Sequence, residues 1–192
     1  IYKNRRSFIK SIGLGASSLA ISTIPFSNKS FANDRDKLTS YKDITTYNNY
    51  YEFGTSKSDP YRNSQIFKTT PWEISIEGEV EKPIKLSMEE ISEMFVSEER
   101  IYRLRCVEGW SMVIPWMGFS LSELLSKVNP TNKAKFVEFE SVYDPAQMKG
   151  QRYPVLNWPY NEGLRIDEAM HPLTTVVTGL YGKKLPNQNG AP

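Results

Sequence analysis

Apolar and polar residues alternate strictly in the stretch WEISIEGEV, which begins at Trp72. Every second residue from Trp72 to Ile76 is apolar, and the residues between them are polar. This period of two predicts a half-buried strand. A Lys-Pro turn follows, and Ile84 and Leu86 predict a second short extended segment after it. Two consecutive short strands are therefore expected in this part of the chain.

Two segments carry the serine and glutamate spacing of a capping box, which marks the first turn of a helix. Ser87 stands three residues before Glu90, and Ser120 stands three residues before Glu123. In such a box each side chain bonds the backbone N–H of the other residue. The second box opens the i, i+3, i+4, i+7 stripe of a core-facing helix, which consists of Leu121, Leu124, Leu125 and Val128. Two short helices are expected, and an Asn-Pro pair ends the second.

Further short segments complete the expected secondary structure. A strand is predicted over residues 102–106, with the cysteine on its apolar face and two arginines on the other face. Residues 134–144 and 173–182 predict two more strands, and residues 164–171 predict a brief helical turn. Residues 33–47 are polar, show no apolar period and predict a linker. This mixture of short strands and helices predicts an α+β fold.

Composition limits the class of protein. The chain has 192 residues, of which 39% are hydrophobic and 24% charged, which is typical of one globular domain with a proper core. The formal net charge is only +2, and the basic residues are scattered along the sequence. These features disfavour a nucleic-acid partner, because such proteins concentrate positive charge on one face. With one cysteine, the chain cannot form an internal disulfide.

The first 32 residues have the features of an export signal. The pair Arg5-Arg6 precedes a weakly apolar run from residue 12 to residue 24, and Ala32 ends a small-x-small cleavage site. The run is too short to span a bilayer. The pattern is similar to a bacterial twin-arginine signal, an address that directs folded proteins to the periplasm. An ordinary secretory signal and a basic N-terminal helix are the alternatives. On the twin-arginine interpretation, residues 33–192 form the mature domain.

Cys106 is the residue with the most chemical potential, and four roles are open to it: buried filler, nucleophile, redox sensor or metal ligand. A nucleophile needs a base, and His171 is the sole histidine. A site built from several Cys and His ligands is excluded because the chain has too few of either. A metal carried by an organic cofactor could still take one protein thiolate. Arg103 and Arg105 would favour the thiolate form, or they are simply charges on a strand face.

Four longer motifs carry a resemblance to a known family. They are YNNYYEFG at 47–54, EERIYRLRCVEGWSMVIPWMGF at 98–119, RIDEAMHPLT at 165–174 and YGKKLPNQNGAP at 181–192. In this order they closely resemble the catalytic subunits of the periplasmic protein-methionine-sulfoxide reductases, molybdenum enzymes of the sulfite-oxidase fold family. The resemblance extends from about residue 47 to residue 192. It implies a sulfite-oxidase-type, molybdopterin-binding domain.

The resemblance also implies a cofactor site with one molybdenum-molybdopterin for each chain. In that family the cysteine of the Arg-Cys-Val-Glu-x-Trp-Ser motif ligates the metal, and here that residue is Cys106. The positions that match cofactor-contacting residues are Asn48, Tyr51, Glu52, Ser141 and Asn189. Ser141 stands where the family usually has threonine. Each of the five has a plainer interpretation: asparagines favour turns, the tyrosine could be a packing aromatic, and the glutamate could be a solvated charge. The family continues beyond this last motif with further cofactor-binding residues, so the C-terminal part of the domain is expected to be missing here.

The activity implied by the resemblance is reduction of methionine sulfoxide in periplasmic proteins by oxygen-atom transfer. Electrons would come from a membrane haem b subunit, and oxidised periplasmic proteins would be the substrates. A sulfite oxidase of the same fold is one alternative, although Glu108 lies two residues after the cysteine, where an oxyanion pocket would not favour an acid. An exported binding module without a cofactor, with Cys106 as core, is another. Asp167, Glu168 and His171 also match the family, but no role is assigned to them.

Overall fold

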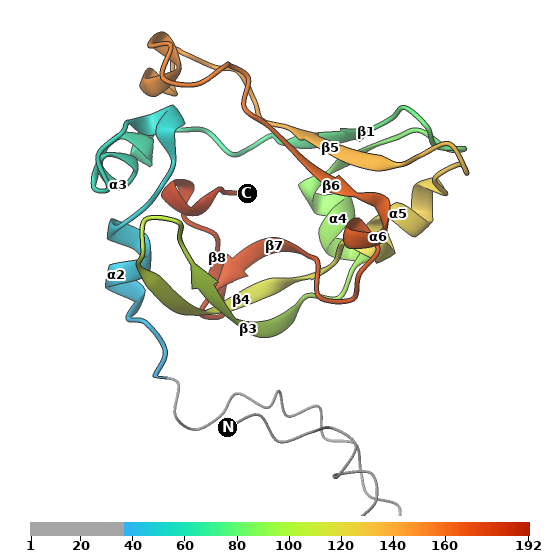
Figure 1. Ribbon diagram of the computed structural model, residues 1–192, viewed down its shortest axis with the longest axis horizontal. Helices are drawn as coiled ribbons and strands as arrows, with labels where there is room; N and C mark the ends of the chain where they lie inside the picture. Colours follow the sequence, from blue (N-terminus) through green and yellow to red (C-terminus); the bar gives the residue numbers. More distant parts are fainter. Residues whose placement is uncertain (1–36) are drawn as a thin grey trace, which may run out of the picture.

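A computed structural model describes residues 37–192, and the predicted signal at residues 1–32 therefore lies outside the described residues (Figure 1). The described chain combines short helices with three separate antiparallel sheets. The predicted α+β class is therefore confirmed. No helix within this part of the chain is long and apolar enough to cross a membrane.

The largest sheet has the strand order β3-β4-β7-β8. Its strands are β3 at Glu98–Arg105, β4 at Ser111–Ser120, β7 at Thr175–Leu180 and β8 at Lys183–Lys184. The first two form a hairpin whose last pair joins Arg105 to Ser111. The residues between these two strands form the tip of the hairpin, and they include the cysteine.

Two smaller sheets are simple hairpins. One pairs β1 at Glu73–Ile76 with β2 at Ile84–Ser87, which confirms the two strands predicted from alternation. The other pairs β5 at Phe136–Glu140 with β6 at Asn161–Arg165. Strand β5 ends one residue before Ser141.

The helices are all short. The α-helices are α2 at Tyr41–Thr46, α3 at Asp59–Asn63, α4 at Met88–Met94, α5 at Leu121–Val128 and α6 at Ile166–Ala169. Single 3₁₀ turns are η1 at Tyr51–Phe53, η2 at Ser64–Ile66, η3 at Lys149–Arg152 and η4 at Asn187–Asn189. Figure 1 shows α4, α5 and α6 gathered on one side, between the small hairpins and the main sheet.

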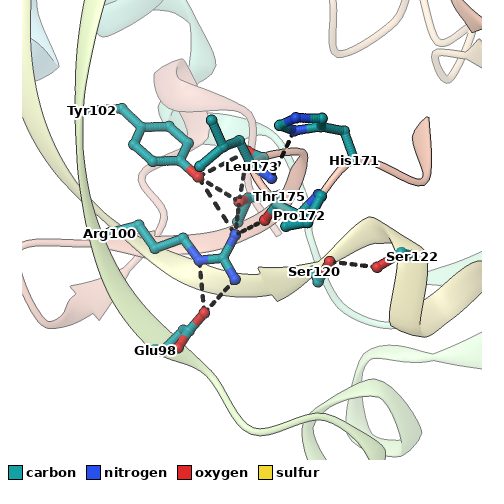
Figure 2. Close-up of polar contacts among 9 residues, drawn as sticks. All are labelled: Glu98, Arg100, Tyr102, Ser120, Ser122, His171, Pro172, Leu173 and Thr175. Atoms are coloured by element: carbon teal, nitrogen blue, oxygen red, sulfur yellow. Dashed lines mark hydrogen bonds and ion pairs between the residues drawn. The ribbon is translucent and has the colours of Figure 1, made fainter. Parts of the chain in front are cut away.

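One of the two predicted capping boxes is present. The Glu90 amide donates to Ser87 Oγ at 3.2 Å, and the Ser87 amide donates to Glu90 Oε2 at 2.8 Å. The second box is wrong: Ser120 makes no capping hydrogen bond, and its hydroxyl bonds that of Ser122 at 2.7 Å instead (Figure 2). The helix forms nevertheless, because its apolar stripe is buried and decides its position.

The linker predicted for residues 33–47 is also wrong in its second half, where α2 forms. Ser40 caps this helix by accepting from the Asp43 amide at 3.1 Å. Ile44 is buried in a cluster with Met112, Ile114 and Leu180 of the main sheet. One buried isoleucine is too little for a periodic pattern, so only the tertiary contact reveals the helix.

The main core lies between the helices and the sheets. Its buried members come from β2, α4, β4, α5 and α6, and they are Leu86, Ile91, Phe95, Phe119, Leu121, Leu124, Leu125 and Ala169. Phe95 and Phe119 stack with ring centroids 4.3 Å apart. This core lies on the opposite side of the fold from α2 and α3 (Figure 1). The hairpin tip and the C-terminal turn η4 are not part of it.

We expect Leu124→Ala to lower the free energy of unfolding by about 2–5 kcal/mol, because it removes a buried side chain and leaves a cavity. Denaturant unfolding of the full-length protein measures the change. Val96→Ala is the matched control, since Val96 is 87% exposed and its truncation should cost almost nothing. Equal losses for the two variants would contradict this account of the core.

Candidate functional site

Cys106 lies at the tip of the β3–β4 hairpin, one residue beyond the strand on which it was predicted. Its amide donates to the Trp110 carbonyl at 2.9 Å, and the Gly109 amide donates to the Cys106 carbonyl at 3.0 Å. Gly109 has a φ of 89°, a conformation that glycine adopts at little cost. Two backbone hydrogen bonds and this glycine therefore fix the backbone that carries the thiol.

The sulfur of Cys106 has two hydrogen-bond donors nearby. Asn49 Nδ2 lies 3.8 Å from Sγ, and the backbone amide of Glu108 lies 3.5 Å from it. The side chain is partly exposed, and Val107 beside it is fully exposed. A buried filler would sit among apolar atoms, so this setting disfavours that role and places the sulfur where it accepts hydrogen bonds.

A polar cluster surrounds the hairpin tip. Lys57 Nζ donates to Asn49 Oδ1 at 2.6 Å and to Glu108 Oε1 at 2.8 Å. Trp110 Nε1 donates to Glu108 Oε2 at 3.0 Å. The hydrogen bond with Glu108 raises the pKa of Lys57, and the bonds from Lys57 and Trp110 lower the pKa of Glu108. Both groups are therefore charged at neutral pH.

Asn48 and Asn189 meet in a cavity of about 260 Å³ next to this cluster. Their Nδ2 atoms donate to the same acceptor, the Ile44 carbonyl, at 3.0 and 3.1 Å. Both Oδ1 atoms are buried without a hydrogen-bond partner. Such an acceptor costs about 1–3 kcal/mol unless a donor reaches it, so the pair marks a place for a ligand with N–H or O–H groups.

The cavity and the thiol are neighbours. Asn49 lines the cavity and donates to Cys106 Sγ. The rest of the cavity wall is largely apolar and includes Trp110 and Trp116 from the hairpin. A ligand in the cavity could therefore extend toward the sulfur.

Glu52 is buried in η1, with 5% of its surface exposed. No hydrogen bond pairs its carboxylate with another side chain in the described part of the chain, and burial raises its pKa. Burial, with the charge of Glu52 as a smaller cause, raises the pKa of Tyr50 to about 12. A buried carboxyl without a counter-charge is typical of a functional position, and the solvated-charge interpretation of Glu52 is wrong.

Tyr51 and Ser141, the remaining two predicted site residues, do not line the cavity next to Asn48 and Asn189. Tyr51 lines a second cavity of about 380 Å³, together with Lys149, Gly150 and Tyr153. Gly150 lies so close to η1 that an added Cβ would come 1.9 Å from the Tyr51 carbonyl oxygen. Ser141 follows β5, and its amide donates to the Tyr160 carbonyl at 2.9 Å. The structure thus gathers Asn48, Asn189 and Cys106 but does not gather Tyr51 and Ser141 with them.

Sequence reasoning missed four residues that contact the thiol or its neighbours: Asn49, Lys57, Glu108 and Trp110. Glu108 and Trp110 lie two and four residues after the cysteine, so their proximity could have been predicted from the hairpin turn. Asn49 stands beside a predicted site residue, but only its partner contacts reveal its role. Lys57 carries no local signal, because its contact with Glu108 spans 51 residues.

His171 belongs to a different polar cluster, on the loop before β7 (Figure 2). Arg100 donates to the Pro172 carbonyl at 2.7 Å, and the Tyr102 hydroxyl donates to the Leu173 carbonyl at 2.8 Å. The cysteine follows Arg100 by six residues of extended chain, a separation of roughly 20 Å. A Cys106–His171 catalytic pair is therefore not formed. Within residues 37–192, no group of three or more His, Cys, Asp and Glu side chains could hold a metal ion.

The comparisons with known proteins show the family of the chain. Residues 61–192 match the family described as "Oxidoreductase molybdopterin binding domain". The chain is 60% identical over 157 residues to the protein-methionine-sulfoxide reductase catalytic subunit MsrP of Xanthomonas axonopodis pv. citri, covering 82% of this chain and 49% of that protein. It is 58% identical to the same subunit of Burkholderia mallei, covering 47% of it. The chain thus spans about half the length of these relatives.

A solved structure shows the same fold. The sulfane dehydrogenase SoxCD of Paracoccus pantotrophus superimposes with a TM-score of 0.51, at 12% identity, over 91% of this chain and 53% of that one. At this identity the likeness concerns the fold alone, and it confirms the predicted architecture.

We expect Glu52→Gln to stabilise the cofactor-free full-length chain at neutral pH. A carboxyl whose folded-state pKa exceeds its unfolded value of 4.5 binds its proton more tightly when folded. Its stability contribution is therefore complete below pH 4.5 and is lost as the pH rises through the folded-state pKa.

Thermal unfolding at pH 4 and pH 7 checks this expectation. The variant should lose less stability than the wild type between the two pH values. Glu140→Gln is the control, since Glu140 is exposed. If Glu52→Gln behaved like the control, burial of an uncompensated carboxyl would be the wrong account.

Proposed function

Because the chain belongs to the oxidoreductase molybdopterin binding domain family, we propose that it is the cofactor-binding part of a molybdenum-dependent protein-methionine-sulfoxide reductase. The observation that carries the proposal is the arrangement at the hairpin tip. A single thiol with two hydrogen-bond donors lies beside a cavity in which two buried carbonyl oxygens lack partners.

The residues present fit a pterin that carries a metal. A pterin ring has several N–H donors, and the Oδ1 atoms of Asn48 and Asn189 are unpaired acceptors. Cys106 offers the soft thiolate that molybdenum takes in such a cofactor. Glu52, buried in η1, is assigned as a further acceptor, and Tyr51 and Ser141 are assigned to parts of the cofactor farther from Asn189.

When bound, the cofactor supplies a two-electron oxygen-atom transfer, in which a sulfoxide, two electrons and two protons give a thioether and water. The chain's own contribution is to hold the thiolate in place. Asn49 Nδ2 and the Glu108 amide both donate to the sulfur, and this disperses its negative charge. The backbone bonds of the turn fix the main chain from which the sulfur projects.

The exposure of the hairpin tip supports a protein as the substrate. Val107, next to the cysteine, is fully exposed. A methionine sulfoxide on the surface of another protein can approach such a protruding tip, whereas it could not enter a closed cavity. Glu108 is an acidic residue two positions after Cys106, in the turn that carries the thiol, and this does not favour a site for a sulfite anion.

The proposed electron donor is a membrane haem b subunit. The relatives are named as catalytic subunits, which supports the existence of a partner subunit. We place the mature protein in the periplasm, where the twin-arginine pattern at residues 1–32 would direct it after folding. The mature domain on this proposal is residues 33–192 and whatever follows them.

We expect Cys106→Ser in the full-length holoprotein to abolish reduction of methionine sulfoxide, because a hydroxyl is a much poorer ligand for a soft metal than a thiolate. Activity is measured with an oxidised protein substrate and an artificial electron donor. Circular dichroism should show an unchanged fold.

Val96→Ser is the control, since Val96 is exposed and distant from the tip in sequence. Full activity in Cys106→Ser would remove the metal-ligand assignment. Turnover of sulfite in place of sulfoxide by the wild type would favour the sulfite oxidase alternative, and a wild type that carries no molybdenum would favour a binding module.

Replacing Arg5 and Arg6 together by Lys should leave the precursor in the cytoplasm, because the export receptor reads the guanidinium pair and not only its charge. Cell fractionation followed by immunoblotting measures the distribution. Lys3→Arg is the matched control and should be exported normally. Unchanged export of the double variant would point to the general secretory route.

A further inference from the structure

We propose that Lys57 is a positioning residue that sets the orientation of the Asn49 amide toward the Cys106 sulfur and thereby tunes the metal site. The inference rests on the proposed function, because it takes the sulfur to be a metal ligand. Nothing in the motifs points to this lysine, and its role follows from its contacts alone.

Lys57 joins two segments that are far apart in the sequence. Its Nζ donates to Asn49 Oδ1 at 2.6 Å and to Glu108 Oε1 at 2.8 Å. The side chains of Lys57 and Glu108 are only 23% and 35% exposed, so water screens the pair less than it screens a surface ion pair. One cation therefore holds both polar groups that approach the sulfur.

The lysine decides which end of the Asn49 amide faces the thiol. An ammonium group only donates hydrogen bonds, so the atom of Asn49 that contacts it must be the oxygen. The nitrogen then points the other way, where it lies 3.8 Å from Cys106 Sγ and donates to it. Without the lysine the amide could turn over and place its oxygen against a thiolate, which would be repulsive.

Lys57 also contacts Glu108, the residue that supplies the second hydrogen-bond donor to the sulfur. Lys57 holds one carboxylate oxygen and Trp110 Nε1 holds the other, so the side chain is fixed at both atoms. The backbone amide of the same residue donates to the sulfur at 3.5 Å. Lys57 thus contacts the Asn49 amide, which donates to the sulfur, and the side chain of Glu108, whose backbone amide also donates to it.

A hydrogen bond to a metal-bound thiolate withdraws charge from the metal and raises the reduction potential. Removing Lys57 should therefore lower the potential of the metal. Loss of its positive charge acts in the same direction, so a second variant must separate the two effects.

The test uses the full-length holoprotein and a redox titration followed by electron paramagnetic resonance. Lys57→Met should change the reduction equilibrium by about tenfold toward the oxidised form, which is ~59 mV for a one-electron couple. Lys57→Arg, which keeps the charge and several donors, should restore most of the wild-type potential. Lys85→Met is the matched control, because it breaks a Lys–Glu pair of 2.7 Å on the β1–β2 hairpin and should leave the potential unchanged.

A double-variant comparison separates orientation from charge. In an Asn49→Leu background, Lys57→Met should shift the potential clearly less than it does in the wild type, because the amide that it positions is gone. Equal shifts in the two backgrounds would show that the lysine acts by charge alone and would overturn the proposal. An unchanged potential in Lys57→Met with normal molybdenum content would also overturn it.

Failure of the proposed function has a different signature. A wild-type protein that carries no molybdenum and gives no metal resonance would contradict the reductase assignment and remove the premise of the inference with it. Wild-type molybdenum with a normal resonance, combined with no effect of Lys57→Met, would contradict the positioning role alone.

Discussion

The site depends on one shared hydrogen-bond acceptor, the carbonyl of Ile44 near the end of α2. It binds the amide nitrogens of Asn48 and Asn189, which come from opposite ends of the described chain. Each nitrogen is satisfied there, whereas each amide oxygen is buried without a hydrogen-bond partner. The apolar packing of Ile44 against the main sheet holds this arrangement in place despite the cost of two unpaired acceptors.

The hydrogen-bonding character of the site changes from the cavity to the hairpin tip. The cavity presents acceptors, the oxygens of Asn48 and Asn189, while the tip presents donors to the sulfur of Cys106. A ligand that satisfies the two oxygens must carry N–H or O–H groups, and the sulfur is the one soft donor beside them that an electrophilic metal could take.

The parts of the structure that could be predicted from the sequence are those governed by local rules. The alternation of apolar and polar residues predicted β1 and β2, and the capping box that begins at Ser87 predicted α4. The box at Ser120 failed because burial of the helix stripe, not capping, decides that helix. Helix α2 and the role of Lys57 could not be predicted, since both depend on contacts between distant segments. Within the site the motifs pointed to Cys106, Asn48 and Asn189, whereas the parts played by Asn49 and Lys57 emerged only from the fold.

On the proposed function, the metal ligand Cys106 stands at the tip of a hairpin and not in a deep cavity. A metal site requires its ligand to stay within a fraction of an ångström, and a hairpin turn that projects from a sheet has few neighbours to hold it there. Lys57 and Asn49 brace the tip from a second segment of the chain, so the exposed position gains rigidity without being covered. On the proposed function, this combination of accessibility and rigidity would suit an enzyme whose substrates are side chains on the surfaces of other proteins.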